Sequence, residues 1–204
     1  GLICSMFRPS DDATIFPYLI PANFFAVVSL KQAAEMVKVI HQDQALANDC
    51  LTLATEVEQA LKKYGTAAHP DFGRIYAYEV NGFGSYNLMD DAGTPSLLSL
   101  PYLDAVSLKD KTYQRTRRFI LSGENPFYIQ GKAGAGVGSP HAGINNVWPL
   151  GIITRAMTSM DQAEIKKEIR LLLSTHAGTG FIHESFHRDD PQNFTRKWFA
   201  WANT

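Results

Sequence analysis

The chain has 204 residues, of which 45% are hydrophobic and 11% aromatic, which is enough apolar material to bury the core of one sizeable domain. Nineteen basic residues balance twenty acidic ones, so the net charge is −1. The chain therefore has no strong positive electrostatic field that would attract nucleic acid or an anionic membrane. No uninterrupted apolar stretch reaches the length of a bilayer span.

Two long helices are predicted first, as an inner and outer pair. Pro21 starts a helix over about 22–40 that is apolar on nearly all sides at its beginning, which is typical of a buried helix. The next helix, 43–64, has a single apolar stripe opposite its charges, and Gly65 ends it. An amphipathic helix of this kind is expected to cover the buried one.

The segment 75–86, IYAYEVNGFGSY, alternates aromatic residues around Asn81-Gly82. Asn-Gly is a preferred pair in two-residue turns, so a small β-hairpin is predicted here. Long loops joining alternating inner and outer helices favour an all-α fold of the α/α toroid type, with function in the loops. The further helices are expected near 96–103, 112–121, 146–158 and 161–175, and from about Thr195.

The segment 178–191, GTGFIHESFHRDDP, contains the H-E-x-x-H pattern of zinc hydrolases. That pattern holds a metal only where a helix places His183 and His187 on the same face. Glycines precede the pattern, Pro191 follows it, and no apolar stripe accompanies it, so we expect a loop, without metal or cofactor. A zinc hydrolase acting through His183 and His187 is the minor alternative.

Three other loops carry polar groups beside aromatic residues: RPSDDA at 8–13, YNLMDDA at 86–92, and GKAGAGVGSPHAG at 131–143. Each has a structural alternative, as a helix cap, a surface ion pair or a core histidine. The glycines of the third loop miss the dinucleotide-binding register, and no serine has the context of a nucleophile elbow. Carboxylate pairs with flat rings suit glycoside hydrolysis, because one acid protonates the leaving oxygen, a second carboxylate handles water or the anomeric carbon, and the rings pack on a pyranose.

The chain resembles the C-terminal half of glycoside hydrolase family 125 over essentially its whole length, in the segments ICSMFRPSDDATIFPYLIPANFFAV, GSYNLMDDAGTPSLLSLPY, GSPHAGINNVWPL and HAGTGFIHESFHRDDPQNFTRKWFAWANT. This resemblance implies part of an (α/α)6 barrel and an inverting, metal-independent exo-α-1,6-mannosidase that removes terminal α-1,6-linked mannose from N-glycan-type oligosaccharides. Residues 1–204 are then expected to be the C-terminal portion of a single catalytic domain whose N-terminal half is missing. About half of the helices of such a barrel are predicted here.

The resemblance also implies roles for single residues. The general acid falls in the SDDA motif, at Asp11 with Asp12 as the fallback, and the general base is Glu184. Asp11 must then hold a proton while Glu184 is ionised, and inversion requires about 6.5 to 9.5 Å between the two carboxyl groups, against about 5 to 5.5 Å in a retaining enzyme. The candidates for binding sugar hydroxyls are Arg8, Asp12, Asn87, Asp90, Asp91, His141 and His183, while Trp148 and Trp198 are expected as pocket walls or core.

The expected partner is a mannose-containing oligosaccharide, with no nucleic acid and no membrane, and the oligomeric state is left open. Cys4 and Cys50 lie in apolar segments and are expected to be buried free thiols. We expect a cytoplasmic location, with secretion open because the sequence starts without an initiating Met. A noncatalytic carbohydrate-binding remnant of an (α/α)6 glycosidase is the alternative function.

Overall fold

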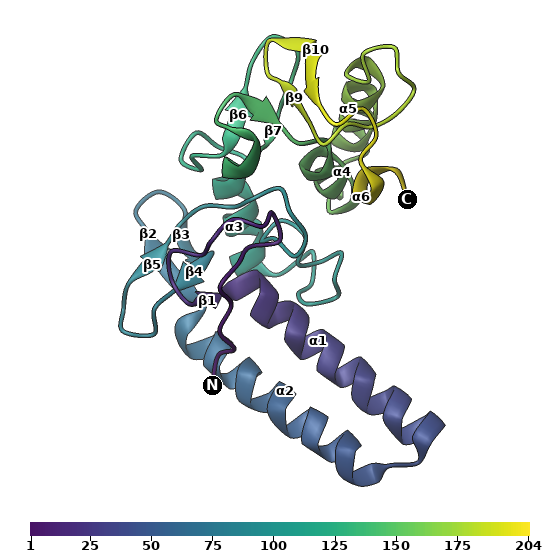
Figure 1. Ribbon diagram of the computed structural model, residues 1–204. Helices are drawn as coiled ribbons and strands as arrows, with labels where there is room; N and C mark the ends of the chain where they lie inside the picture. Colours follow the sequence, from purple (N-terminus) through teal and green to yellow (C-terminus); the bar gives the residue numbers. More distant parts are fainter.

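The computed structural model describes all residues from Gly1 to Thr204. The chain is mainly helical, with four small antiparallel sheets (Figure 1). The helices are α1 (Ile20–Met36), α2 (Gln44–Tyr64), α3 (Lys111–Ile120), α4 (Pro149–Met157), α5 (Gln162–Ser174) and α6 (Ala200–Asn203), with a π-helical turn η1 (Val37–His41) and a 3-10 turn η2 (Pro140–Ala142). The strands are β1 (Tyr18–Leu19), β2 (Thr66–His69), β3 (Gly73–Tyr76), β4 (Glu79–Val80), β5 (Tyr86–Asn87), β6 (Tyr128–Gln130), β7 (Ala135–Val137), β8 (Asn146–Val147), β9 (Ser185–His187) and β10 (Asp190–Thr195).

Helices α1 and α2 form a long antiparallel hairpin that projects from the rest of the chain (Figure 1). Pro21 lies in the first turn of α1, and the Asp43 side chain caps α2 by accepting a hydrogen bond from the Leu46 N–H (2.9 Å). The inner and outer pair predicted from periodicity is therefore present. The expected burial of the first helix is confirmed only in part, because Ala34 is buried whereas Met36 is exposed.

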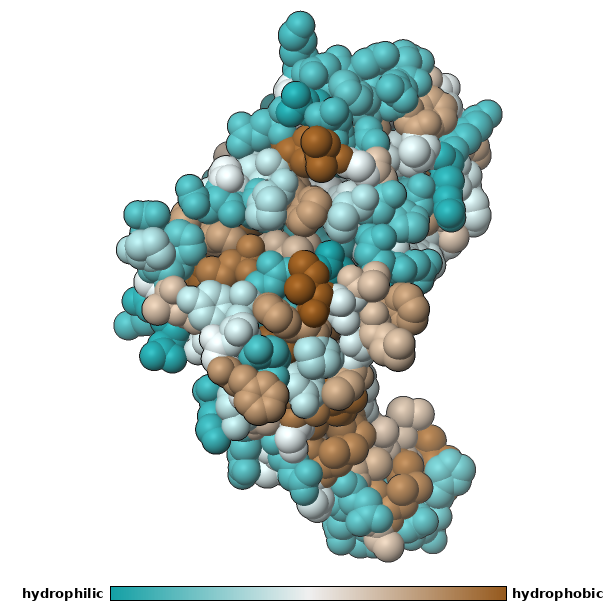
Figure 2. Space-filling model, turned by 60° about the vertical axis from the view of Figure 1, so that its left-hand side comes forward, coloured by the Kyte–Doolittle hydropathy of each residue, from teal (hydrophilic) through white to brown (hydrophobic).

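Apolar surface extends along the projecting hairpin (Figure 2). None of the helices combines the length and the apolar character needed to cross a membrane. The exposed apolar side chains of this hairpin include Phe25, Met36, Val39, Ile40, Leu46, Leu51 and Leu53.

The mostly helical expectation is confirmed, but ten short strands pair the loops with one another where a single small hairpin was predicted. The predicted turn at Asn81-Gly82 does join two paired strands, β4 and β5, but through a five-residue loop, 81–85. Ile75 belongs to a separate hairpin, β2–β3. Strands of two to four residues leave no period in the sequence, since their pairing depends on distant partners.

The segment 96–103 forms consecutive turns and not the predicted helix. Ser96 and Ser99 are both buried, and their hydroxyl groups accept each other's backbone N–H. Serine side chains that bond nearby backbone groups in this way compete with helix formation. The 112–121 and 161–175 predictions correspond to α3 and α5, whereas 146–158 begins with strand β8 before α4.

The main hydrophobic core contains twenty buried residues, including Tyr78 from the first half of the chain and Trp148 from the second. Trp148 packs edge-on against Phe199, with ring centroids 5.9 Å apart. This contact holds the C-terminal segment against the start of α4. Both cysteines are free, as expected, but Cys4 is exposed and Cys50 is half-buried, so their predicted burial is wrong.

Candidate active site

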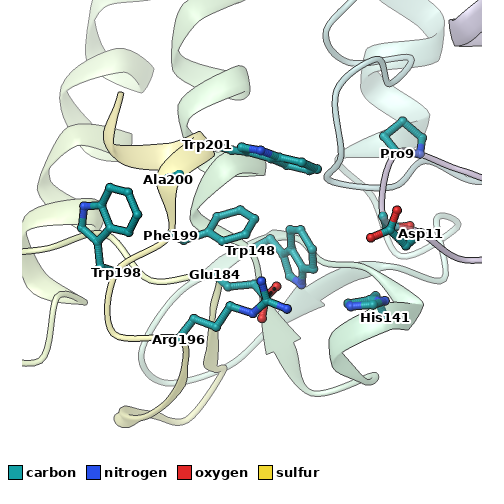
Figure 3. A pocket seen from close by; sticks show the side chains of 11 residues that line it. Pro9, Asp11, His141, Trp148, Glu184, Arg196, Trp198, Phe199, Ala200 and Trp201 are labelled. Carbon is teal, nitrogen blue, oxygen red and sulfur yellow. Dashed lines mark ion pairs between the residues drawn. The ribbon is translucent and has the colours of Figure 1, made fainter.

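A cavity of about 270 Å³ lies between the opening loop of the chain and its C-terminal segment (Figure 3). Three stretches that are far apart in the sequence meet there: the opening loop, the region around η2 and β8, and the segment that surrounds β9, β10 and α6. The lining residues are Pro9, Ser10, Asp11, His141, Trp148, Glu184, Arg196, Trp198, Phe199, Ala200 and Trp201.

Asp11 lies at the tip of the opening loop, which is closed by a β-bridge between Phe7 and Ala13. The Arg8 N–H donates to the Asp12 carbonyl (2.8 Å) and the Asp11 N–H to the Arg8 carbonyl (3.0 Å). Asp11 itself has φ 68, a left-handed conformation that Asp tolerates better than most residues. Its carboxylate lines the cavity (Figure 3) and makes no hydrogen bond or ion pair with another side chain.

Two neighbours of Asp11 are held by buried carboxylates. The Ser10 hydroxyl donates to Asp91 Oδ2 at 2.8 Å, and Asp91 also accepts the Gly93 N–H. Burial raises the pKa of Asp91. Asp91 is 1% exposed and does not line the cavity. It therefore contacts the opening loop and not the cavity itself.

Arg8 is also turned away from the cavity. Its Nε donates to Glu79 Oε1 at 2.7 Å, and its guanidinium lies over the Tyr78 ring. Burial lowers the pKa of Arg8, but the hydrogen bond and charge of Glu79, together with the nearby acidic groups, outweigh this, so the net change is upward. Glu79 was missed by sequence reasoning, although a single carboxylate within the apolar run IYAYEV was a usable signal.

Asp90 and Asn87 lie outside the cavity as well. Asp90 is fully buried, and its two oxygens accept the N–H groups of Leu97 (2.8 Å) and Leu98 (2.9 Å). Burial raises its pKa to about 8. The Asn87 amide donates to Glu79 Oε2 at 3.3 Å. Both oxygens of Asp90 cap the turns at 97–98 and Asp90 does not line the cavity, so its sugar contact stays a prediction.

His141 lines the cavity, at the start of η2. Its Nδ1 is 3.5 Å from Asp12 Oδ1, and its ring meets Trp148 edge-on, with centroids 6.3 Å apart. Asp12 does not line the cavity but contacts both His141 and Ser10, whose hydroxyl lies 3.2 Å from Asp12 Oδ2. The pair Asp12–His141 thus connects the opening loop to the wall formed by Trp148.

Glu184 enters the cavity from the opposite side, immediately before β9 (Figure 3). It is 7% exposed, and its Oε1 lies 3.3 Å from Arg196 Nε. The expected loop over 178–191 is wrong from residue 185 onward, because β9 and β10 form a hairpin there. The burial of Phe186 in a small apolar cluster stabilises this hairpin, a long-range effect that local sequence does not show.

The zinc alternative is wrong on geometry, because the helix it requires is replaced by a loop and strand β9. His183 is buried and stacks on Phe194, and its ring nitrogens lie 2.9 Å from the Lys197 carbonyl and 3.2 Å from the His176 carbonyl. His187 accepts the Asp189 N–H. No group of three potential metal-ligating side chains occurs. His183 does not line the cavity either, and its sugar contact stays a prediction.

The structure therefore brings three predicted residues, Asp11, Glu184 and His141, to one cavity. Trp148 and Trp198 also form part of its wall. Sequence reasoning missed Arg196 and Trp201, although both lie in the basic and aromatic run TRKWFAW. Flat rings around a pair of carboxylates can pack on the apolar face of a sugar while the carboxylates exchange protons with it.

Comparison with known proteins gives consistent matches over the whole chain. The family model for metal-independent alpha-mannosidases, GH125, matches residues 1–204. The Meiotically up-regulated gene 157 protein of Schizosaccharomyces pombe is 46% identical over 206 residues, which is all of this chain and 40% of that protein. A solved metal-independent alpha mannosidase of Streptococcus pneumoniae, in a non-productive complex with alpha-1,6-mannobiose, has a TM-score of 0.95 and 42% identity, and the match covers 98% of this chain and 47% of that chain. The chain spans less than half the length of these two relatives.

Proposed function

The chain belongs to glycoside hydrolase family 125, the metal-independent α-mannosidases, and on that basis we propose that it forms part of an inverting exo-α-1,6-mannosidase. The substrate class is a mannose-containing oligosaccharide of the N-glycan type with a terminal α-1,6-linked mannose. Support for the linkage comes from the streptococcal relative, which was solved with alpha-1,6-mannobiose in work on the processing of N-linked glycans.

The observation that carries the mechanism is the presence of Asp11 and Glu184 on facing walls of one cavity (Figure 3). In an inverting reaction, protonated Asp11 donates its proton to the glycosidic oxygen as the C–O bond breaks. Ionised Glu184 takes a proton from a water molecule, whose oxygen attacks the anomeric carbon from the other face. The products are mannose of inverted configuration and an oligosaccharide with a free hydroxyl.

The aromatic wall suits this substrate. Trp148, Phe199 and Trp201 surround the space beside Glu184 (Figure 3), and aromatic faces pack on the C–H groups of a pyranose. His141 and Arg196 supply hydrogen-bond donors at the edges of the same space.

We also propose that residues 1–204 are the C-terminal portion of a single (α/α)6 catalytic domain. Two observations support this: the relatives are more than twice as long as the part matched here, and apolar side chains such as Met36, Val39 and Ile40 are exposed on the projecting hairpin. Exposed apolar surface of this kind is normally covered by further structure. Other helices of the same domain would pack on it.

The function is tested by proton NMR on the full-length protein incubated with α-1,6-mannobiose. The anomeric signal of freshly released mannose, recorded before mutarotation, reports both cleavage and stereochemistry. Release of β-mannose is expected, whereas initial release of α-mannose would mean a retaining mechanism. Binding without any release would favour the noncatalytic carbohydrate-binding alternative.

A further inference from the structure

Glu79 accepts several hydrogen bonds from the opening loop, although it does not line the cavity. It is 0% exposed and lies on β4, the middle strand of the sheet β1-β4-β5. One oxygen accepts Arg8 Nε at 2.7 Å. The other accepts the N–H groups of Ile15 (3.1 Å) and Phe16 (3.4 Å) and the amide of Asn87 (3.3 Å).

These contacts fix the opening loop on both sides of Asp11. Arg8 precedes Asp11 in the loop, and Ile15 and Phe16 follow it, yet all three donate to the same buried carboxylate. Asp11 has no side-chain partner of its own and a left-handed backbone, φ 68. Its position over the cavity is therefore determined by the groups that hold its neighbours.

Asp91 supplies a second, independent attachment. It accepts the Ser10 hydroxyl at 2.8 Å and is itself buried. The residue directly before Asp11 is thus held from one side by Asp91, while the ends of the loop are held from the other by Glu79. Both carboxylates come from the segment 79–91, so this segment serves as the base on which the loop rests.

We propose that Glu79, acting through Arg8 and the backbone of Ile15 and Phe16, is a positioning residue for the proton transfer from Asp11. This inference rests on the proposed function, in which Asp11 is the general acid. Asp91 assists through Ser10. Holding the acid in line with the glycosidic oxygen matters because a displacement of about 1 Å can reduce a rate by about 10²-fold.

The experiment compares two substrates of the full-length protein, one whose leaving group needs a proton and one whose leaving group does not. α-1,6-Mannobiose has a sugar hydroxyl as leaving group, which must be protonated as it departs. 2,4-Dinitrophenyl α-mannoside releases a phenolate that departs without a proton. The variant Glu79→Gln keeps the shape of the side chain but removes the charge that Arg8 faces.

The expected result is a fall of about 10²-fold in kcat for the mannobiose, with a fall of less than about threefold for the dinitrophenyl substrate. KM for both substrates should change little, because Glu79 does not reach the cavity. Equal losses on both substrates, or no loss on either, would overturn the proposal. Should Glu79→Gln not fold, Arg8→Lys is judged by the same ratio, since Lys cannot reproduce the Nε bond.

Glu168→Gln is the matched control. Glu168 is also 0% exposed and paired with an arginine, with its Oε1 3.2 Å from Arg155 Nη1, but it lies on α5 away from the cavity. It should lower thermal stability without changing the ratio of the two rates. Absence of mannobiose cleavage by the unaltered protein would instead refute the proposed function, which separates the two failures.

Discussion

Arg196 and Glu184 form an ion pair on the cavity wall, with Arg196 Nε 3.3 Å from Glu184 Oε1. Glu184 is almost completely buried, whereas the Arg196 side chain is 63% exposed. Arg196 has φ 44, so its backbone is in the left-handed region, and its guanidinium also lies over the Phe199 ring. The chain leaves β10 through this residue and turns its side chain back toward Glu184.

Replacement of Arg196 by Met should lower kcat of the full-length protein for α-1,6-mannobiose by roughly two- to fivefold, the effect of an exposed ion pair worth under about 1 kcal/mol. In the proposed mechanism, the cation orients the carboxylate that takes the proton from water. Arg188→Met is the control, because Arg188 pairs with Asp189 at the other end of the same hairpin. Equal rates for the two variants would show that the Arg196 pair has no role in turnover.

Asp11→Asn and Glu184→Gln should each reduce hydrolysis of α-1,6-mannobiose by at least about 10²-fold, since each removes one of the two groups proposed to transfer protons. Both changes conserve shape, so the melting temperature should stay close to that of the unaltered protein. Initial rates and thermal melts of the full-length protein check this. If Asp12→Asn loses activity while Asp11→Asn keeps it, the acid is Asp12.

Gly138 lies where β7 approaches β8, in a bridge with Val147. An added Cβ would collide with the Asn146 carbonyl and lie 2.9 Å from the Ile129 side chain. Gly138→Ala should therefore destabilise the fold by about 1 to 3 kcal/mol, and it should weaken substrate binding because Ser139 and His141 follow directly. Gly123→Ala, where an added Cβ meets nothing within 4 Å, should be nearly neutral in thermal melts. A stable Gly138→Ala protein would contradict this packing.

Asp90 should make stability depend on pH. Burial raises the pKa of its carboxyl group from 3.8 to about 8. The folded chain then keeps a proton that the unfolded chain releases, so the stabilising contribution is complete below about pH 4 and is lost as the pH rises toward about 8. Burial also raises the pKa of Asp91.

The test compares Asp90→Asn with the unaltered protein in thermal melts from about pH 4 to pH 8. Asn cannot ionise, so the difference in melting temperature should move in favour of the variant as the pH rises. Asp161→Asn serves as the control, because Asp161 is an exposed cap of α5 and Asn caps a helix equally well. A constant difference for Asp90→Asn across this range would refute the assignment.

The resemblance to glycoside hydrolase family 125 is confirmed by the match over residues 1–204. Helices α2 and α5 were predictable from local sequence, since an apolar stripe and a capping Asp are properties of neighbouring residues. At α5, Asp161 caps the helix locally, whereas Glu164 pairs with Arg117 and Arg155. A sequence pattern does not show whether a charged side chain will bond to a neighbouring residue or to one that is distant in the sequence.

The sequence by itself determined the helical periods, the carboxylate-bearing loops and, through long motifs, the family. Only the tertiary structure decided which carboxylates reach the cavity. Asp90, Asp91 and Glu79 are the same residue types as Asp11 and Glu184, yet the first three bond to groups outside the cavity, as Glu79 does to Arg8, 71 residues away. A buried charge needs a specific partner to offset its desolvation, and the fold, not the local pattern, supplies that partner.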